Sequence, residues 1–236
     1  MICAILHNIT MKMSVQSAVV CRNVLVCISC SFNHTMWQRL NDRKGGFMQK
    51  ENLSATEALE RLKEGNERYL TATSNPGDIS PKIRQTTCDE GQSPYAIIVA
   101  CSDSRVIPES IFMAGIGELF VIRVAGNVID NHQLGSIEYA AGHLGSKLVV
   151  VLGHEHCGAV NAAVHGNPDG YVKYITDEIR KAIGEEKDEL RACCLNVERS
   201  VSVIKDSLNI EEGKNDGLKV CGAVYHIGSG EVKFLD

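Results

Sequence analysis

The chain has 236 residues, a formal net charge of −5 at pH 7, 44% hydrophobic residues and 22% charged residues. A chain of this size can bury one substantial core, and its composition is that of a soluble globular protein. The acidic balance argues against nucleic acid as a ligand, because binding to phosphates needs clustered Lys and Arg, and no segment approaches the ~20 apolar residues of a membrane span.

Ten cysteines occur in the chain, which is a high number for this length. They lack the regular spacing of a secreted disulfide scaffold, and several lie inside apolar runs or beside His and Gly. These features favour a reducing, cytoplasmic compartment in which some thiols bind a metal. Four other cysteines are interpreted as packing residues in the core or in a helix: Cys88, Cys193, Cys194 and Cys221.

Residues 1–47 carry a net charge of +4 and four of the ten cysteines, whereas the following residues carry −9. They have neither the order of a signal peptide nor the Arg-rich composition of a transit peptide. The codons for residues 43–47 can form a strong bacterial ribosome-binding site just before Met48. We therefore predict that translation starts at Met48 and that residues 1–47 are non-native; a disordered natural extension is the alternative. Residues 48–236 are predicted to form a single domain.

A capping-box pattern, with Glu57 three residues after Ser54, predicts the start of a helix. Apolar residues then recur at helical spacing with charges between them, so the predicted helix is amphipathic and runs to about residue 70. Residues 71–81 are polar and contain two prolines and a glycine, which predicts a connecting loop.

Four short apolar runs then alternate with helical stretches. The runs at 95–100 and 147–152 have the unbroken character of strands buried on both faces of a parallel sheet. The order of elements predicts an α/β fold with a mainly parallel central sheet flanked by helices. The predicted strands are 95–100, 119–122, 147–152 and 218–225, and the predicted helices lie within 108–113, 134–144 and 171–207.

Metal-competent residues follow the first and third of these runs. Cys101 comes directly after the first run, and His154 and Cys157 follow the third, three residues apart. Because the carboxyl ends of parallel strands meet at one edge of a sheet, we expect these side chains to lie close together. Two thiolates and an imidazole suit zinc, and three protein ligands leave a fourth position for chemistry. The alternative for each cysteine is packing in the core, and His156 is expected to point elsewhere.

Asp103 and Arg105 lie just after Cys101, at a spacing that favours an ion pair. Such pairing would keep the carboxylate ionised and aimed, so that it could accept the proton of a zinc-bound hydroxide in a hydrogen bond. The alternative is a surface ion pair that contributes ~0–1 kcal/mol. A third interpretation makes Cys101 a nucleophile, as in cysteine phosphatases. It is poor, because those enzymes place an Arg six residues after the Cys and Arg105 is four residues after it.

The two clusters together resemble those of the β-class carbonic anhydrases, over about residues 53–235. The motifs are Cys-x-Asp-Ser-Arg and, about fifty residues later, Gly-His-x-x-Cys-Gly. The resemblance implies one Zn²⁺ per subunit on Cys101, His154 and Cys157, with Asp103 and Arg105 as the catalytic dyad. It also implies that Gln92, Phe120 and Tyr139 contact the substrate or line its pocket.

The activity implied by this resemblance is the reversible hydration of carbon dioxide to bicarbonate and a proton by zinc-bound hydroxide. The family forms homodimers or homotetramers with the pocket close to the subunit interface. Two rivals remain: a carbon disulfide or carbonyl sulfide hydrolase on the same fold, and a zinc-holding protein that has lost activity.

Some members of the family close the zinc site at low pH, when the counterpart of Asp103 becomes the fourth ligand. Those members carry a bicarbonate-binding Trp three residues before the first Cys, together with a Val and an Arg. Val106 and Arg123 match the latter two, but Ile98 stands at the Trp position. We therefore expect a site that stays open near neutral pH, with Asp103 as a zinc ligand only if the site closes.

Overall fold

The computed structural model describes residues 52–75, 77–208 and 217–235, all within the compact unit Gln49–Asp236. The predictions for residues 1–47 and for a translation start at Met48 lie outside the described residues and stay predictions.

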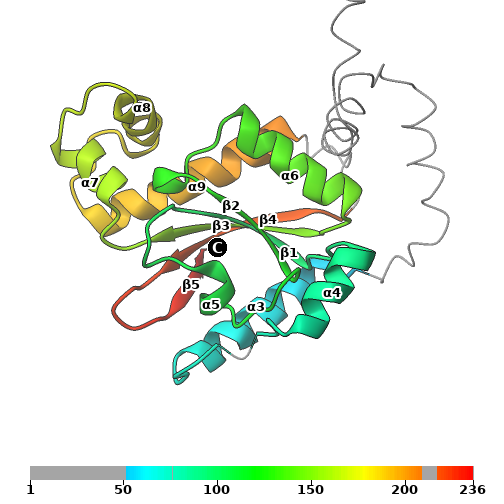
Figure 1. Cartoon of the computed structure of the whole chain (residues 1–236). Coiled ribbons are helices and arrows are strands. Elements are labelled where there is room, and N and C mark those ends of the chain that lie inside the picture. Colours follow the sequence, from blue (N-terminus) through cyan, green and yellow to red (C-terminus); the bar gives the residue numbers. More distant parts are fainter. Residues whose placement is uncertain (1–51, 76, 209–216, 236) are drawn as a thin grey trace, which may run out of the picture. The chain divides into compact units, whose positions relative to one another are not determined.

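A five-stranded sheet forms the centre of this unit (Figure 1). Its strands are β1 (Ala96–Ala100), β2 (Leu119–Arg123), β3 (Leu148–His154), β4 (Lys219–Tyr225) and β5 (Val232–Leu235). The order across the sheet is β2-β1-β3-β4-β5; the first four strands pair in parallel, and β5 is antiparallel to β4. β1 and β3 are buried along their whole length, as expected of parallel strands covered on both faces. The predicted fold class is confirmed.

Helices cover both faces of the sheet (Figure 1). They are α3 (Ala55–Tyr69), α4 (Pro81–Glu90), α5 (Pro108–Ile111), α6 (Asn131–His143), α7 (Gly158–His165), α8 (Val172–Ile183) and α9 (Glu189–Ser207). Alternate residues of β1 enter two cores: Ile98 packs in the cluster that includes residues of α3 and α5, and Ile97 and Val99 pack in the cluster of α6 and α9. α7, α8 and the first half of α9 enclose a third cluster, which contains Cys101 and Cys157.

Helix α3 begins at the predicted capping box. The Ser54 side chain accepts a hydrogen bond from the Glu57 amide, and the Glu57 carboxylate accepts one from the Ser54 amide. Farther along the helix, the buried side chain of Asn66 donates to the carbonyls of Ile111 (3.3 Å) and Gly230 (2.9 Å). These bonds join α3 to the end of α5 and to the turn between β4 and β5.

Several elements differ from the sequence prediction. α4 was not predicted because it has no buried residue, so no apolar period marks it. The short helix α7 and the short strand β5 were also missed. The stretch predicted as helical over 171–207 is two helices, because α8 ends at Gly184, which has a φ of 55°. The predicted loop 71–81 is correct over 71–75 and 77–80, the part of it that the structure describes, and Ser80 caps α4.

The packing role predicted for four cysteines is confirmed only in part. Cys193 is buried, Cys194 and Cys221 are half-buried, and Cys88 is exposed, so the interpretation of Cys88 as a core residue is wrong. Cys88 lies on α4, the helix without buried residues. In the part of the chain that the structure describes, no helix is both long and apolar enough to cross a membrane.

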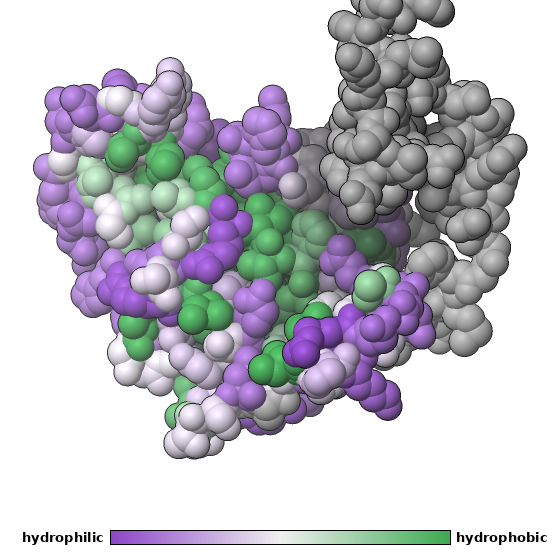
Figure 2. Space-filling model, in the orientation of Figure 1, coloured by the Kyte–Doolittle hydropathy of each residue, from purple (hydrophilic) through white to green (hydrophobic). Residues whose placement is uncertain are grey.

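The surface of the sheet-centred unit is uneven in polarity. In the view of Figure 2, apolar side chains gather in a band across the middle of the face, between α6 and the helices α3 to α5. Strand β2 is an edge strand with one neighbour, and its residues Phe120, Val121 and Ile122 are only half-buried. An apolar edge of this kind is a template for pairing with another chain.

Candidate metal centre and active site

The structure brings the three predicted metal ligands together. Cys101 follows β1, His154 ends the neighbouring strand β3, and Cys157 caps α7. All three are buried, with exposures of 4%, 1% and 4%. Their ligand atoms all lie within 4.8 Å of one another. No fourth Cys, His or carboxylate joins this group among the described residues.

The chemistry of these three side chains fits a metal dication. The Nε2 atom of His154 is buried and has no hydrogen-bond partner within the described structure, although its Nδ1 atom lies 2.9 Å from the Glu155 carbonyl. A hydrogen bond with Cys157 lowers the pKa of Cys101, and the same bond, with burial, raises the pKa of Cys157. Two buried thiolates side by side need a nearby positive charge, and two sulfurs with one imidazole are a donor set that zinc favours.

Cys101 is further held by the turn after β2. The Gly126 amide donates to the Cys101 sulfur at 3.2 Å, and the buried Asn196 of α9 donates to the Gly126 carbonyl at 2.7 Å. Gly126 has a φ of 70°, and a Cβ there would lie 2.8 Å from the Ile179 side chain. Neither Gly126 nor Asn196 was identified from the sequence; the Ala-Gly-Asn run just beyond the second predicted strand was the available signal.

Asp103 forms an ion pair with Arg105 and does not belong to the ligand group. Arg105 donates Nε to Oδ1 at 2.9 Å and Nη2 to Oδ2 at 2.7 Å, and its backbone amide also donates to Oδ1 at 2.9 Å. These hydrogen bonds, the side-chain ones first, hold the pKa of Asp103 well below its usual range. The carboxylate is therefore ionised and fixed in direction beside Cys101.

The surrounding residues hold this segment from two sides. Arg105 also donates Nη2 to the His156 carbonyl at 3.1 Å. Arg123 donates to the carbonyls of Cys101 (3.0 Å) and Asp103 (2.7 Å). Ile98, which stands where the regulated members of the family carry a Trp, is fully buried in the core. The absence of bicarbonate control stays a prediction.

The three predicted pocket residues lie elsewhere in the chain. Gln92 is exposed and precedes β1, whereas Cys101 follows that strand. Phe120 lies beside Ile97 in the register, four residues before Cys101, which corresponds to ~13 Å along a strand. Tyr139 on α6 is 48% exposed, and its ring centroid is 6.2 Å from that of Phe120. One chain thus assembles the ligands and the dyad, but it does not bring Gln92, Phe120 and Tyr139 to them.

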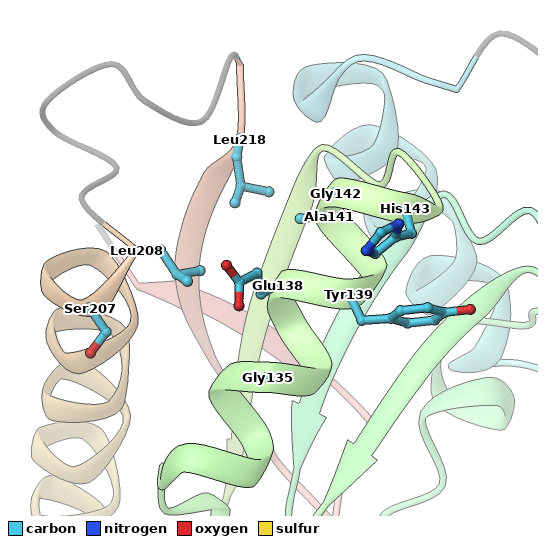
Figure 3. A pocket seen from close by; sticks show the side chains of 9 residues that line it. All are labelled: Gly135, Glu138, Tyr139, Ala141, Gly142, His143, Ser207, Leu208 and Leu218. Carbon is cyan, nitrogen blue, oxygen red and sulfur yellow. The ribbon is translucent and has the colours of Figure 1, made fainter. Parts of the chain in front are cut away.

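Tyr139 also borders a cavity of about 610 Å³ between α6 and the ends of α9 and β4 (Figure 3). Its lining residues are Gly135, Glu138, Tyr139, Ala141, Gly142, His143, Ser207, Leu208 and Leu218. Figure 3 shows Glu138 pointing toward Leu208 and Tyr139 pointing to the other side of the helix. None of these residues belongs to the metal group, so the cavity is separate from the metal group of the same chain.

Comparison with known proteins supports the family that the sequence motifs resemble. A family profile described as carbonic anhydrase matches residues 96–232. The chain is 35% identical over 198 residues to carbonic anhydrase 2 of Mycobacterium tuberculosis (strain CDC 1551 / Oshkosh). This alignment covers 78% of this chain and 95% of that relative. It is 37% identical over 196 residues to the carbonic anhydrase of Mycolicibacterium smegmatis, covering 77% and 94% of the two chains.

Solved structures show the same likeness. A chain from the crystal structures of two tetrameric β-carbonic anhydrases of Sordaria macrospora superimposes with a TM-score of 0.58 at 28% identity, over 76% of this chain and 94% of that one. The β-carbonic anhydrase CafA of Aspergillus fumigatus gives a TM-score of 0.55 at 30% identity, over 66% and 81%. Together with the buried Cys-His-Cys group, these matches establish that the chain belongs to the β-carbonic anhydrase family of enzymes.

Proposed function

We propose that the protein catalyses the reversible hydration of carbon dioxide to bicarbonate and a proton, with one Zn²⁺ per subunit held by Cys101, His154 and Cys157. The observation that carries the proposal is the pairing of this buried ligand group with Asp103, a carboxylate that Arg105 holds in a bidentate contact. The thiol ligands also support the prediction of a reducing, cytoplasmic location, since all six cysteines among the described residues are free.

When bound, zinc supplies Lewis acidity that lowers the pKa of a coordinated water, to ~7 in the carbonic anhydrases that are the reference case for this effect. The residues of the chain then orient the attacking oxygen. An ionised carboxylate is purely a hydrogen-bond acceptor, and the hydrogen bonds from Arg105 lower the pKa of Asp103 further and fix the direction of its oxygens. By accepting a hydrogen bond, Asp103 would orient the attacking oxygen toward the carbon of carbon dioxide.

The substrate pocket is proposed to include residues of a second copy of the chain, in a homodimer or homotetramer. Gln92, Phe120 and Tyr139 are exposed or half-buried and lie away from the metal group of their own chain. The half-buried apolar edge at β2 gives a surface for such an assembly, and the Sordaria macrospora relatives are tetrameric. In this arrangement the three residues of one subunit would line the pocket at the metal group of the other.

The test is a stopped-flow hydration assay on the purified chain, combined with metal analysis, before and after treatment with a zinc chelator. We expect about one zinc per chain, loss of hydration on its removal and recovery when zinc is returned. A zinc-loaded protein without hydration activity would refute the proposal. If that protein hydrolysed carbon disulfide or carbonyl sulfide instead, the rival enzyme would be correct.

A further inference from the structure

The two residues between the ligands His154 and Cys157 form a turn that needs support. His156 has a φ of 53°, in the left-handed region. This conformation is strained for a residue with a Cβ, so such residues persist where the surroundings hold them. His156 itself is exposed, and its side chain does not join the ligand group.

The Glu155 side chain connects this turn by hydrogen bonds to the loop that follows β4. Its Oε1 atom accepts a hydrogen bond from the Gly228 amide at 2.9 Å, and its Oε2 atom accepts one from the Nδ1 atom of His226 at 3.2 Å. We call these three groups the Glu155 clasp. The side chains of His226 and Glu155 are only 19% and 22% exposed, so these bonds are shielded from water more than an ordinary surface pair is.

The loop that carries the clasp is itself well anchored. The His226 amide donates to the Glu231 carbonyl, and the Gly230 amide donates to the His226 carbonyl, both at 2.8 Å. The Gly230 carbonyl accepts from Asn66 of α3 at 2.9 Å. Glu155 is therefore held against a loop that both its own hydrogen bonds and a neighbouring helix keep in place.

The clasp bears on the metal site through the backbone of Glu155. The Glu155 amide donates to the Tyr225 carbonyl at 3.1 Å, and its carbonyl oxygen accepts from Nδ1 of His154 at 2.9 Å. Because Nδ1 donates this hydrogen bond, Nε2 is the imidazole atom that is left to bind a metal together with the two sulfurs. Outer hydrogen bonds of this kind orient metal-binding histidines, and their loss typically weakens metal binding by ~10–100-fold.

We propose that the Glu155 clasp is a positioning device for His154: it holds the Glu155 carbonyl in the place that fixes the imidazole, and so raises the affinity of the site for zinc. The inference rests on the proposed function only in taking zinc as the metal. Glu155 and His226 are positioning residues here and need not touch the substrate. The clasp joins residues 71 positions apart, through the parallel pairing of β3 with β4.

The test compares Glu155→Ala with Glu231→Ala in the full-length chain. The Glu231 side chain is exposed and forms a long ion pair of 4.0 Å with Lys233, so Glu231→Ala removes the same charge and keeps the backbone carbonyl that accepts from the His226 amide. Zinc affinity is measured by competition with a chromophoric chelator, and the thermal stability of the metal-free chain is measured beside it. The absorption spectrum of the cobalt-substituted protein reports the geometry of the ligands.

We expect Glu155→Ala to weaken zinc binding by ~10–100-fold and to alter the cobalt spectrum, with Glu231→Ala like the wild type. Equal zinc affinity in the two variants would overturn the inference, and so would a loss confined to the stability of the metal-free chain. If Glu155→Ala does not fold, His226→Leu, which removes one of the two bonds, is judged by the same criteria. A wild-type chain that binds no zinc would instead refute the proposed function.

Discussion

The edge of the sheet at the ends of β1 and β3 differs sharply from the region around β2 and α6. At the first, three ligands are buried; Cys101 accepts a hydrogen bond from the Gly126 amide, and His154 donates one to the Glu155 carbonyl. At the second, Phe120 is half-buried and Tyr139 is 48% exposed, and their rings contact each other at 6.2 Å between centroids. One chain therefore gathers the three candidate metal ligands by itself, whereas the pocket is proposed to be completed in an assembly.

Loss of one metal ligand should have the largest effect. Replacing Cys157 by Ser removes one of two sulfur donors from a buried group of three, so zinc and hydration activity should both be lost essentially completely. Metal analysis and stopped-flow assays check this. Cys88→Ser, which alters an exposed thiol, is the control and should behave like the wild type. Retention of zinc and activity by Cys157→Ser would remove Cys157 from the site.

Replacing Asp103 by Asn should leave zinc in place and lower kcat/KM by ~10²–10⁴-fold, the range for loss of a positioned proton acceptor. Asn keeps the shape of the side chain but lacks the charge that Arg105 stabilises. Asp89→Asn, on the exposed helix α4, is the matched control. Unchanged turnover in zinc-loaded Asp103→Asn would mean that Asp103 does not orient the attacking oxygen.

The shared pocket can be tested by combining two damaged chains. Tyr139→Ala should lower kcat/KM by ~10–200-fold, the range for losing a contact in an apolar pocket, without loss of zinc. Co-expression with Cys157→Ser should restore activity above that of either variant, because the intact Tyr139 of the metal-free subunit would serve the zinc of the other. Activity equal to the mean of the two parents would place the pocket within one chain.

The smallest effect concerns stability at the metal edge. Gly126→Ala forces a Cβ into a φ of 70° and within 2.8 Å of Ile179, so the free energy of unfolding should fall by at least ~1–2 kcal/mol. Gly135→Ala on α6 meets no atom within 4 Å and should be neutral or stabilise by up to ~1 kcal/mol. Denaturant unfolding of the metal-free chains measures both. Equal effects would contradict the packed, positive-φ account of Gly126.

Much of this arrangement could be predicted because strand ends carry strong signals. Cys101 and His154 come at the ends of unbroken apolar runs, and parallel pairing of β1 with β3 brings them together. The helix α4 has no buried residue and therefore no apolar period in the sequence; its available signals were Ser80 and Pro81 at its start and Gly91 after its end. The contact of Glu155 with His226 depends on the register of β3 with β4, which no local pattern specifies.

The pocket residues show a different limit. A resemblance assigns Gln92, Phe120 and Tyr139 to the substrate, but only the assembled structure shows that Phe120 lies beside Ile97, with Tyr139 packed on it, and that Gln92 precedes β1. The distance between them is a property of the assembled strands, so sequence reasoning could name these residues but not place them.

Cys101, His154 and Cys157 are proposed to hold zinc with one position left for chemistry. X-ray absorption at the zinc edge of the loaded protein tests this ligand set. We predict two sulfur neighbours at ~2.3 Å and two nitrogen or oxygen neighbours at ~2.0–2.1 Å. A zinc ion with three or four sulfur neighbours, or with none, would contradict it.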